Sequence, residues 1–266
     1  MRIAGVQTDL VWESPEANRE QLAPRIRDAA VRLGARLVVL PEMWPTGFSM
    51  RPEAFAEPAG GPSEKFLVEM AAETGAAVCG SVAQSDGRSA RARNVFLCAM
   101  PDGTVHRYAK IHPFSYGGEA EHYDAGDVLT TFDIDGVRVT PFICYDLRFP
   151  ELWAIAAPRT DLFVVVANWP RPRAAHWKAL LVARAIETQA YVVGVNRVGE
   201  GGGIVYDGAS AIVSPIGELH DDLFERPGEQ RTIEDDVDAS HVAETRKQFP
   251  FLADRRPDVY RRLRGE

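Results

Sequence analysis

Cysteine is scarce in this sequence, and long hydrophobic runs are absent. Only three of the 266 residues are cysteines, namely Cys79, Cys98 and Cys144. Because this number is odd and no two of them form a CxxC pair, we expect neither a disulfide framework nor a zinc site. No segment approaches the roughly 20 apolar residues that a membrane-spanning helix needs. The first residues, MRIAGVQTDL, do not resemble a signal peptide. We therefore expect a cytoplasmic protein with no membrane association.

An excess of positive charge is also missing. The formal net charge is -8 at pH 7, and the arginines are scattered rather than gathered in a stripe. Nucleic acids and anionic membranes attract basic surfaces, so neither is an expected partner. The six histidines include no HxH or HxxxH pair, which argues against a metal site. The run Gly201-Gly202-Gly203 lacks the lysine and the helix of a phosphate-binding loop. We expect no metal and no cofactor.

What the sequence does contain is a series of apolar strands that alternate with helices. Residues 2–7 and 35–42 are predicted strands, and they flank residues 15–34, whose apolar side chains recur at helical spacing. Such a strand–helix–strand unit favours parallel pairing. Further strands are predicted at 76–84, 94–100, 104–110, 161–169, 191–199 and 230–238. Further helices are predicted at 63–75, 150–157, 176–190 and 239–247. A hairpin is predicted at 206–219, around Pro215-Ile216-Gly217.

These elements are interpreted as one α/β domain. No repeat, low-complexity linker or change of composition divides residues 1–266. Residues 111–127 form a long loop rich in glycine, aromatic and acidic residues, and such loops often carry function. The tail at 245–266 contains aromatic residues without a clear period after its short helix. We expect this tail to pack against another surface, as at an oligomer interface.

One short stretch, VTPFICYDLRFPELW at residues 139–153, ends an apolar strand on Cys144. Pro150 and Glu151 are typical of the first turn of a helix, so Cys144 is predicted to lie on a tight strand-to-helix turn. Unpaired backbone N–H groups and the helix dipole favour an anion there, which would suit a thiolate. Cys79 and Cys98 lie inside apolar strands, where a cysteine is usually a core residue.

Two further reactive groups follow predicted strands. Glu42 comes after LVVLP and Lys110 after TVHRYA, as Cys144 comes after VTPFI. Ligand sites of α/β sheets gather at the carboxyl ends of strands. A carboxylate can take the proton of a thiol, an ammonium group can stabilise an oxyanion, and the sulfur can attack a carbonyl or nitrile carbon. The three residues are therefore a candidate catalytic set.

Three motifs resemble those of the carbon–nitrogen hydrolase (nitrilase) superfamily. They are LPEMWPTGF (40–48), YAKIHPF (108–114) and CYDLRFPELW (144–153), and the similarity continues through residues 168–199, 206–217 and 249–260. The resemblance covers nearly the whole chain in the expected order. It implies a four-layer α-β-β-α sandwich in a single domain that usually forms a homodimer.

The resemblance also implies roles for individual residues. Glu42 would be the general base, Cys144 the nucleophile, and Lys110 an oxyanion stabiliser together with the backbone N–H of Tyr145. Glu119 would be a fourth catalytic-site acid in the loop after the lysine, with Glu121 as its rival.

The omega-amidase branch is the part of the superfamily that this chain resembles most. Its members hydrolyse the terminal amide of small acid amides such as 2-oxoglutaramate or 2-oxosuccinamate, so a cation should face the substrate carboxylate. Arg148 and Arg173 are candidates for it, although Arg148 could instead pair with Asp146. The apolar walls are assigned to Phe114, Tyr116 and Trp169. The alternatives are a nitrilase, a carbamoylase, an amidase for another substrate, or a catalytically silent scaffold.

Overall fold

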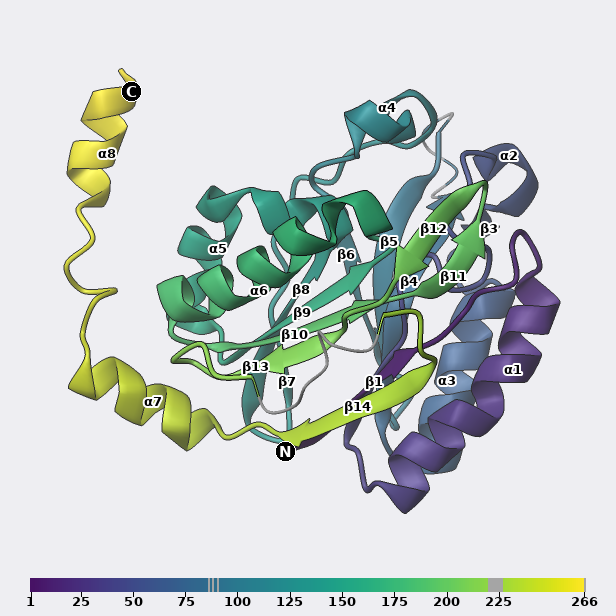
Figure 1. The fold of residues 1–266 in the computed structure, drawn as a ribbon, viewed down its shortest axis with the longest axis horizontal. Coiled ribbons are helices and arrows are strands. Elements are labelled where there is room, and N and C mark those ends of the chain that lie inside the picture. Colours follow the sequence, from purple (N-terminus) through teal and green to yellow (C-terminus); the bar gives the residue numbers. More distant parts are fainter. Residues whose placement is uncertain (86, 88, 90, 220–226, 266) are drawn as a thin grey trace.

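Two β-sheets pack face to face, and helices cover the outer side of each sheet (Figure 1). The computed structural model describes residues 1–85, 87, 89, 91–219 and 227–265. Among the helices in these ranges, none has the length and apolar composition needed to cross a bilayer. The two sheets and the helices outside them form the four α-β-β-α layers that the resemblance implies.

The first sheet combines parallel and antiparallel pairs. Its strands are β1 (Arg2–Gln7), β2 (Leu37–Val39), β4 (Ala77–Ser85), β5 (Arg93–Ala99), β6 (Val105–Ala109) and β14 (Arg231–Asp236), in the order β14-β1-β2-β4-β5-β6, with β3 (Glu57–Pro58) beside β4. β1, β2 and β4 run parallel, because α1 (Pro15–Arg27) and α3 (Pro62–Thr74) return the chain across the sheet between them. The short α2 (Pro52–Phe55) precedes α3.

The second sheet has strand order β13-β10-β9-β8-β7. Its strands are β7 (Phe132–Ile134), β8 (Val137–Ile143), β9 (Leu162–Ala167), β10 (Tyr191–Asn196) and β13 (Ala211–Val213). β8, β9 and β10 are parallel, and α5 (Pro150–Ala156) and α6 (Ala174–Thr188) form the crossovers. β8 and β9 therefore end at the same edge of the sheet, and they bring the residues that follow them to that edge.

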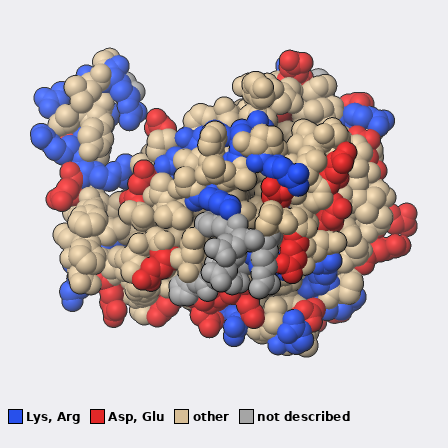
Figure 2. Space-filling model, viewed as in Figure 1, with Lys and Arg blue, Asp and Glu red and all other residues tan. Residues whose placement is uncertain are grey.

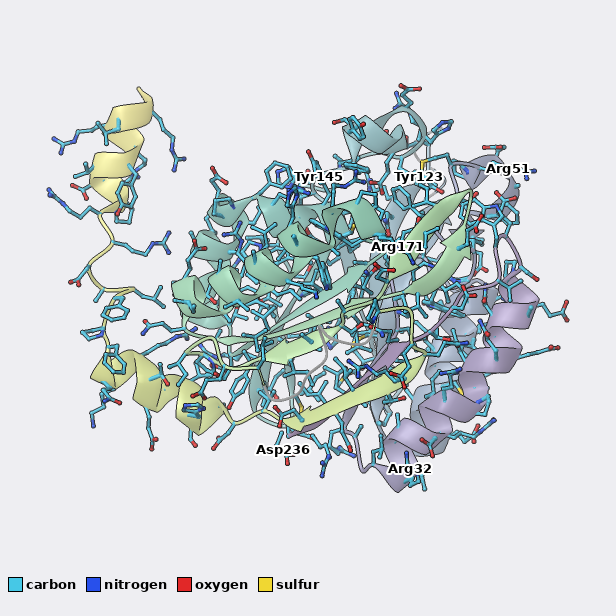
Figure 3. The ribbon with its side chains drawn as sticks, in the orientation of Figure 1. Arg32, Arg51, Tyr123, Tyr145, Arg171 and Asp236 are labelled. Carbon is cyan, nitrogen blue, oxygen red and sulfur yellow. The ribbon has the colours of Figure 1, made fainter. Side chains whose placement is uncertain are left out.

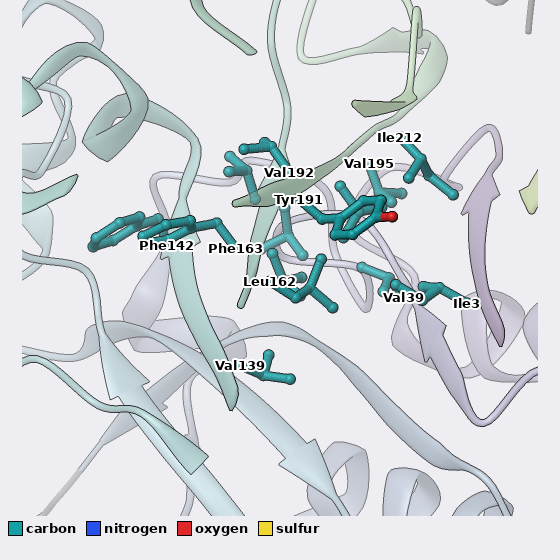
Figure 4. Packing of buried hydrophobic residues seen from close by; sticks show 14 of the residues in the cluster. Ile3, Val39, Val139, Phe142, Leu162, Phe163, Tyr191, Val192, Val195 and Ile212 are labelled. Carbon is teal, nitrogen blue, oxygen red and sulfur yellow. The ribbon is translucent and has the colours of Figure 1, made fainter. Parts of the chain in front are cut away.

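The core lies between the two sheets. Ile3 and Val39 of the first sheet pack in one cluster with Val139, Leu162 and Val192 of the second (Figure 4). All of these side chains are 0% exposed, and burial of this kind contributes about 1.5–3 kcal/mol for each large aliphatic residue. Cys79 and Cys98 lie opposite each other on β4 and β5 within the same cluster, so the prediction that they are core residues is confirmed.

The predicted hairpin at 206–219 is wrong in its first part. β12 (Ile204–Asp207) pairs with β11 (Val198–Gly201) in a separate two-stranded sheet, whereas β13 joins β10. The break has a local cause, because Gly208 and Ala209 both have positive φ values, of 74° and 57°, which end the strand. The predicted turn at Pro215-Ile216-Gly217 is confirmed, because Ser214 donates its N–H to the carbonyl of Glu218 at 2.9 Å and a β-bridge joins Val213 to Leu219.

The C-terminal tail contains more helix than the sequence pattern indicates. After α7 (Ala239–Gln248), the chain forms a second helix, α8 (Pro257–Arg264), which stands away from the rest of the molecule (Figure 1). Proline at its first position suits a helix start, and Val259 and Leu263 are four positions apart, so the expectation that the tail has no period is wrong for α8. Leu263 is 80% exposed and Phe251 is 62% exposed. Within the predicted tail 245–266, only residue 266 lies outside the described residues.

Candidate active site

Cys144 lies at the tip of a strained turn. β8 ends at Ile143, and a 3₁₀ turn over Cys144–Arg148 leads into α5. Cys144 has a φ of 43°, a conformation that costs a residue other than glycine about 1–2 kcal/mol. The N–H of Tyr145 belongs to the first turn of this short helix, where backbone donors have no intrahelical acceptor. The turn therefore presents a sulfur and a backbone donor side by side.

Asp146 holds the turn against the strand that carries the lysine motif. Its carboxylate is buried and accepts hydrogen bonds from the Tyr108 hydroxyl at 2.8 Å, the backbone N–H of His112 at 2.9 Å and the N–H of Ile143 at 3.2 Å. The suggested pairing of Asp146 with Arg148 is wrong, because these three donors turn the carboxylate inward. Asp146 thus links the end of β8 to the end of β6.

Glu42, Lys110 and Glu119 form a buried cluster beside Cys144. The Lys110 Nζ lies 2.8 Å from Glu42 Oε1 and 2.8 Å from Glu119 Oε2, and all three side chains are at most 1% exposed. Glu119 begins α4 (Glu119–His122) in the predicted loop, and it also accepts the N–H of Phe114 at 2.6 Å. Glu121 is exposed on the same short helix. Of the two glutamates that the sequence offers, the fold brings Glu119 to the lysine.

The charges of this cluster act on the thiol. Burial raises the pKa of the Cys144 thiol well above its usual value, the Glu42 carboxylate raises it further, and the Lys110 ammonium offsets part of this. Burial alone would lower the pKa of Lys110, but the charges of Glu119 and Glu42 outweigh it and raise that pKa. The lysine therefore stays protonated. A thiolate in the resting site is not supported, because burial first of all, and the nearby Glu42 carboxylate in addition, raise the pKa of the Cys144 thiol.

Two asparagines hold the glutamates, and neither was predicted to be a site residue. Asn94 on β5 donates through Nδ2 to Glu42 Oε1 at 2.8 Å and to Glu119 Oε1 at 3.1 Å. Asn168, directly after β9, donates its backbone N–H to Glu42 Oε2 at 2.8 Å. The available signal was the position of Asn168 at the carboxyl end of a buried strand, which matches the position of Glu42 and Lys110.

A cavity of about 490 Å³ opens above Cys144. It lies at the edge of the sandwich where Tyr145 and Arg51 are found in Figure 3, near the β11–β12 hairpin of Figure 1. Most of its wall is aromatic or aliphatic, and the residues that line it include Trp12, Phe48, Met50, Phe114, Tyr145, Asn168, Trp169, Gly201, Gly202, Ile204 and Tyr206. An apolar cavity with few polar groups is typical of a site for a small molecule.

Both predicted arginines line this cavity. The guanidinium carbon of Arg148 lies 4.7 Å from the ring centre of Trp169, and that of Arg173 lies 5.4 Å from the ring centre of Phe114. Within the described part of the chain, no carboxylate forms a salt bridge with either arginine. Burial and the positive charge of Arg173 lower the pKa of Arg148. Two cations that share one wall are suited to an anionic ligand.

The assignment of Tyr116 to the wall is not supported by the structure. Phe114 and Trp169 line the cavity as predicted, whereas Tyr116 is 86% exposed and is not part of the lining. The reason is local: Tyr116 lies in a 3₁₀ turn over Ser115–Gly117 and points outward, although its ring centre remains 5.9 Å from the guanidinium carbon of Arg173.

Known proteins with a similar sequence or structure share one family. The carbon-nitrogen hydrolase family model matches residues 2–247. The omega-amidase YafV of Escherichia coli strain K12 is 38% identical over 96% of each chain. The 2-oxoglutaramate amidase of Bacillus subtilis is 31% identical over 97% of this chain and 98% of its own length. A CN-hydrolase superfamily protein from Xanthomonas campestris, solved with an arsenic adduct in its active site, has a TM-score of 0.88 and 35% identity, with coverage of 96% of this chain and 97% of its own.

Proposed function

We propose that this chain, which belongs to the carbon–nitrogen hydrolase family, is a cysteine-dependent amidase that releases ammonia from the terminal amide of a small carboxylic acid amide. The observation that carries this proposal is the buried cluster of Glu42, Lys110 and Glu119 beside Cys144, below a cavity whose wall includes Arg148 and Arg173. The cluster supplies a base, an oxyanion stabiliser and a nucleophile. The arginines supply a partner for the carboxylate of the substrate.

The first half of the reaction forms a thioester. Glu42 accepts the thiol proton as the Cys144 sulfur attacks the amide carbon, and the C=O becomes a tetrahedral oxyanion. The Lys110 ammonium and the N–H of Tyr145 stabilise this oxyanion. Glu42 then gives its proton to the nitrogen, the C–N bond breaks, and ammonia leaves. This sequence fits a thiol whose pKa is raised, because proton removal and attack are coupled through one carboxylate.

The second half of the reaction returns the enzyme to its starting state. Glu42 removes a proton from a water molecule, whose oxygen attacks the thioester carbon. The C–S bond breaks, the sulfur takes the proton back from Glu42, and the carboxylic acid is released. Glu119 accepts a hydrogen bond from Lys110 at 2.8 Å throughout, so its role is to hold the ammonium in place. Glu42 alone therefore accepts and returns each proton in the proposed cycle.

The substrate is proposed to carry a carboxylate away from the amide. Two similar proteins are named omega-amidase and 2-oxoglutaramate amidase, and the cavity has two arginines without a carboxylate partner among the described residues. 2-Oxoglutaramate and 2-oxosuccinamate are the proposed substrates. A nitrile or a carbamoyl amino acid would use the same nucleophile, so these remain the alternatives for this site.

Ammonia release from a panel of compounds tests the reaction class. We expect turnover of short dicarboxylic acid monoamides, and little or none of the matching nitriles and carbamoyl amino acids. Mass spectrometry of enzyme mixed with the amide should show an acyl group on the peptide that contains Cys144. A panel in which only nitriles or carbamoyl compounds react would overturn the amidase assignment, and no turnover at all would favour the silent scaffold.

Arg148→Met and Arg173→Met should weaken binding of the acid amide. A charge-assisted hydrogen bond contributes about 1.5–3 kcal/mol, so KM should rise by roughly 10- to 100-fold for each variant. KM for an uncharged amide of the same length should stay close to the wild-type value. Arg171→Met is the matched control, because Arg171 pairs with Asp207 at 2.7 Å and does not line the cavity. An equal loss on charged and uncharged amides would contradict the carboxylate-binding role.

A second copy of this chain is the proposed partner of the tail. Figure 2 shows α8 separated from the main body, with arginines around it. Phe251 and Leu263 are exposed apolar side chains of the tail. The outer helices α5 and α6 also expose apolar side chains, namely Ile155, which is 61% exposed, and Ile186, which is 50% exposed. Burial of these side chains against a second copy would remove their apolar surface from water. We infer a homodimer in which these surfaces are covered.

Charge placed in this surface should separate the dimer. Phe251→Asp combined with Leu263→Asp should shift the mass measured by sedimentation equilibrium from two chains to one. Val31→Asp is the control, since Val31 is 74% exposed but lies on the helical layer of the other sheet. A wild-type chain that sediments as a monomer would contradict the inference.

A further inference from the structure

The side-chain amide of Asn168 forms a hydrogen bond through its nitrogen but not through its oxygen. Its Nδ2 donates to the backbone carbonyl of Glu42 at 2.6 Å. Its Oδ1 is buried and makes no hydrogen bond within the described structure. A buried acceptor without a donor is unfavourable, because it has lost its hydrogen bonds to water without a replacement. A partner for this oxygen is therefore expected when the site is in use.

The orientation of this amide is fixed by its surroundings. Rotating the group by half a turn would place Oδ1 against the carbonyl oxygen and Oε2 of Glu42, which are both acceptors. The backbone on either side is held as well, since Trp169 donates its N–H to Asn196 Oδ1 at 2.7 Å. The unpaired atom is thus an oxygen whose position the fold determines.

The location of Asn168 limits what that partner can be. The residue is 4% exposed, and it lines the cavity together with Cys144. Its backbone N–H lies 2.8 Å from Glu42 Oε2, so the residue borders the proposed proton carrier. The group that must approach Glu42 during C–N cleavage is the nitrogen of the substrate amide. That nitrogen carries two N–H donors in the substrate and three as ammonia.

We propose that Asn168 Oδ1 accepts a hydrogen bond from the nitrogen of the scissile amide, and that it thereby selects amides over esters. The proposal rests on the amidase function inferred above and adds a specificity-determining residue to it. An ester has an oxygen without a hydrogen at the same position, so its lone pairs would face Oδ1. A site that satisfies a buried polar group with one substrate rejects an analogue that cannot do so.

The test compares an amide and an ester that differ only at this position. Succinamic acid and monomethyl succinate are hydrolysed by wild type, Asn168→Ala and Asn94→Ala, and kcat/KM is measured for each. We expect the ratio of amide to ester to fall by about tenfold in Asn168→Ala, the factor for one lost hydrogen bond. Asn94→Ala is the matched control: Asn94 also donates to Glu42 but does not line the cavity, so both substrates should slow together and the ratio should stay unchanged.

Each outcome separates this inference from the function on which it rests. An unchanged ratio in Asn168→Ala would overturn it, whatever the absolute rates. Wild type that hydrolyses neither compound would instead count against the amidase function. The ratio is measured within one sample, so a partly folded variant still reports it. If Asn168→Ala is insoluble, Asn168→Leu removes the same oxygen from a side chain of similar size: a ratio reduced about tenfold supports the inference, and a wild-type ratio overturns it.

Discussion

Replacing Cys144 with alanine should abolish amide hydrolysis while the protein stays folded. The sulfur is the atom that forms the thioester in the proposed mechanism, and no second thiol can replace it, because Cys79 and Cys98 are fully buried between the sheets. Loss of a nucleophile in a comparable catalytic set costs on the order of 10⁶ in kcat. Ammonia release followed over hours, with heat-treated enzyme as the blank, measures the residual rate.

The backbone of Cys144 provides a second readout in the same experiment. A φ of 43° is strained for cysteine and alanine, but not for glycine. Cys144→Gly should therefore be about 1 kcal/mol more stable than Cys144→Ala in urea unfolding, although both variants are inactive. Turnover by either variant would contradict the proposed nucleophile. Equal stability of the two would contradict only the strain in the turn.

Lys110→Met should lose both activity and stability. Removal of one oxyanion stabiliser costs about 10²–10³ in kcat. The same change leaves Glu42 and Glu119 buried without the ammonium that lies 2.8 Å from each of them. An uncompensated buried charge costs roughly 3–5 kcal/mol. We expect the free energy of unfolding to fall by an amount in this range at neutral pH, as measured by urea denaturation.

The stability of this variant should also depend on pH in a defined direction. Burial already raises the pKa of Glu119, Lys110 lowers it, and Glu42 raises it further. Without the lysine, the pKa of Glu119 in the folded protein rises further above the unfolded value. The folded state then binds a proton that the unfolded state releases, so stability is greatest below the unfolded pKa and is lost as pH rises. The destabilisation relative to wild type should therefore grow as the pH rises above the unfolded pKa of glutamate, which is about 4.3.

A double variant distinguishes charge from packing as the cause. Lys110→Met with Glu119→Gln removes one positive and one negative charge, so much of the lost stability should return and the pH dependence should weaken. Activity should stay as low as in Lys110→Met alone, since the oxyanion stabiliser is still missing. If the double variant were as unstable as the single one, the buried ion pair would not be the source of the destabilisation.

Local pattern predicted most of the strands and helices and placed three candidate reactive residues at the ends of strands. β9 (LFVVVA) is an unbroken apolar run of six residues, and β1 and β8 are largely apolar. Burial on both faces makes such strands recognisable without a structure. Because Glu42, Lys110 and Cys144 each follow a strand, they could be proposed as one set, and the resemblance to the carbon–nitrogen hydrolase motifs implied that they meet. The helix α8 was missed although Val259, Tyr260 and Leu263 recur at helical spacing, because the segment has only eight residues and none of them is buried in this chain.

The remaining parts of the site depend on contacts between distant residues. Glu119 and Glu121 lie two positions apart in one loop, and only the packing of α4 puts the first against Lys110 and leaves the second in solvent. Asn94 and Asn168 reach Glu42 across 52 and 126 positions of the chain. Sequence pattern reports which faces of a strand or helix are apolar. It does not report which polar side chains meet once two sheets have packed together, because that depends on the register and angle of the whole sandwich.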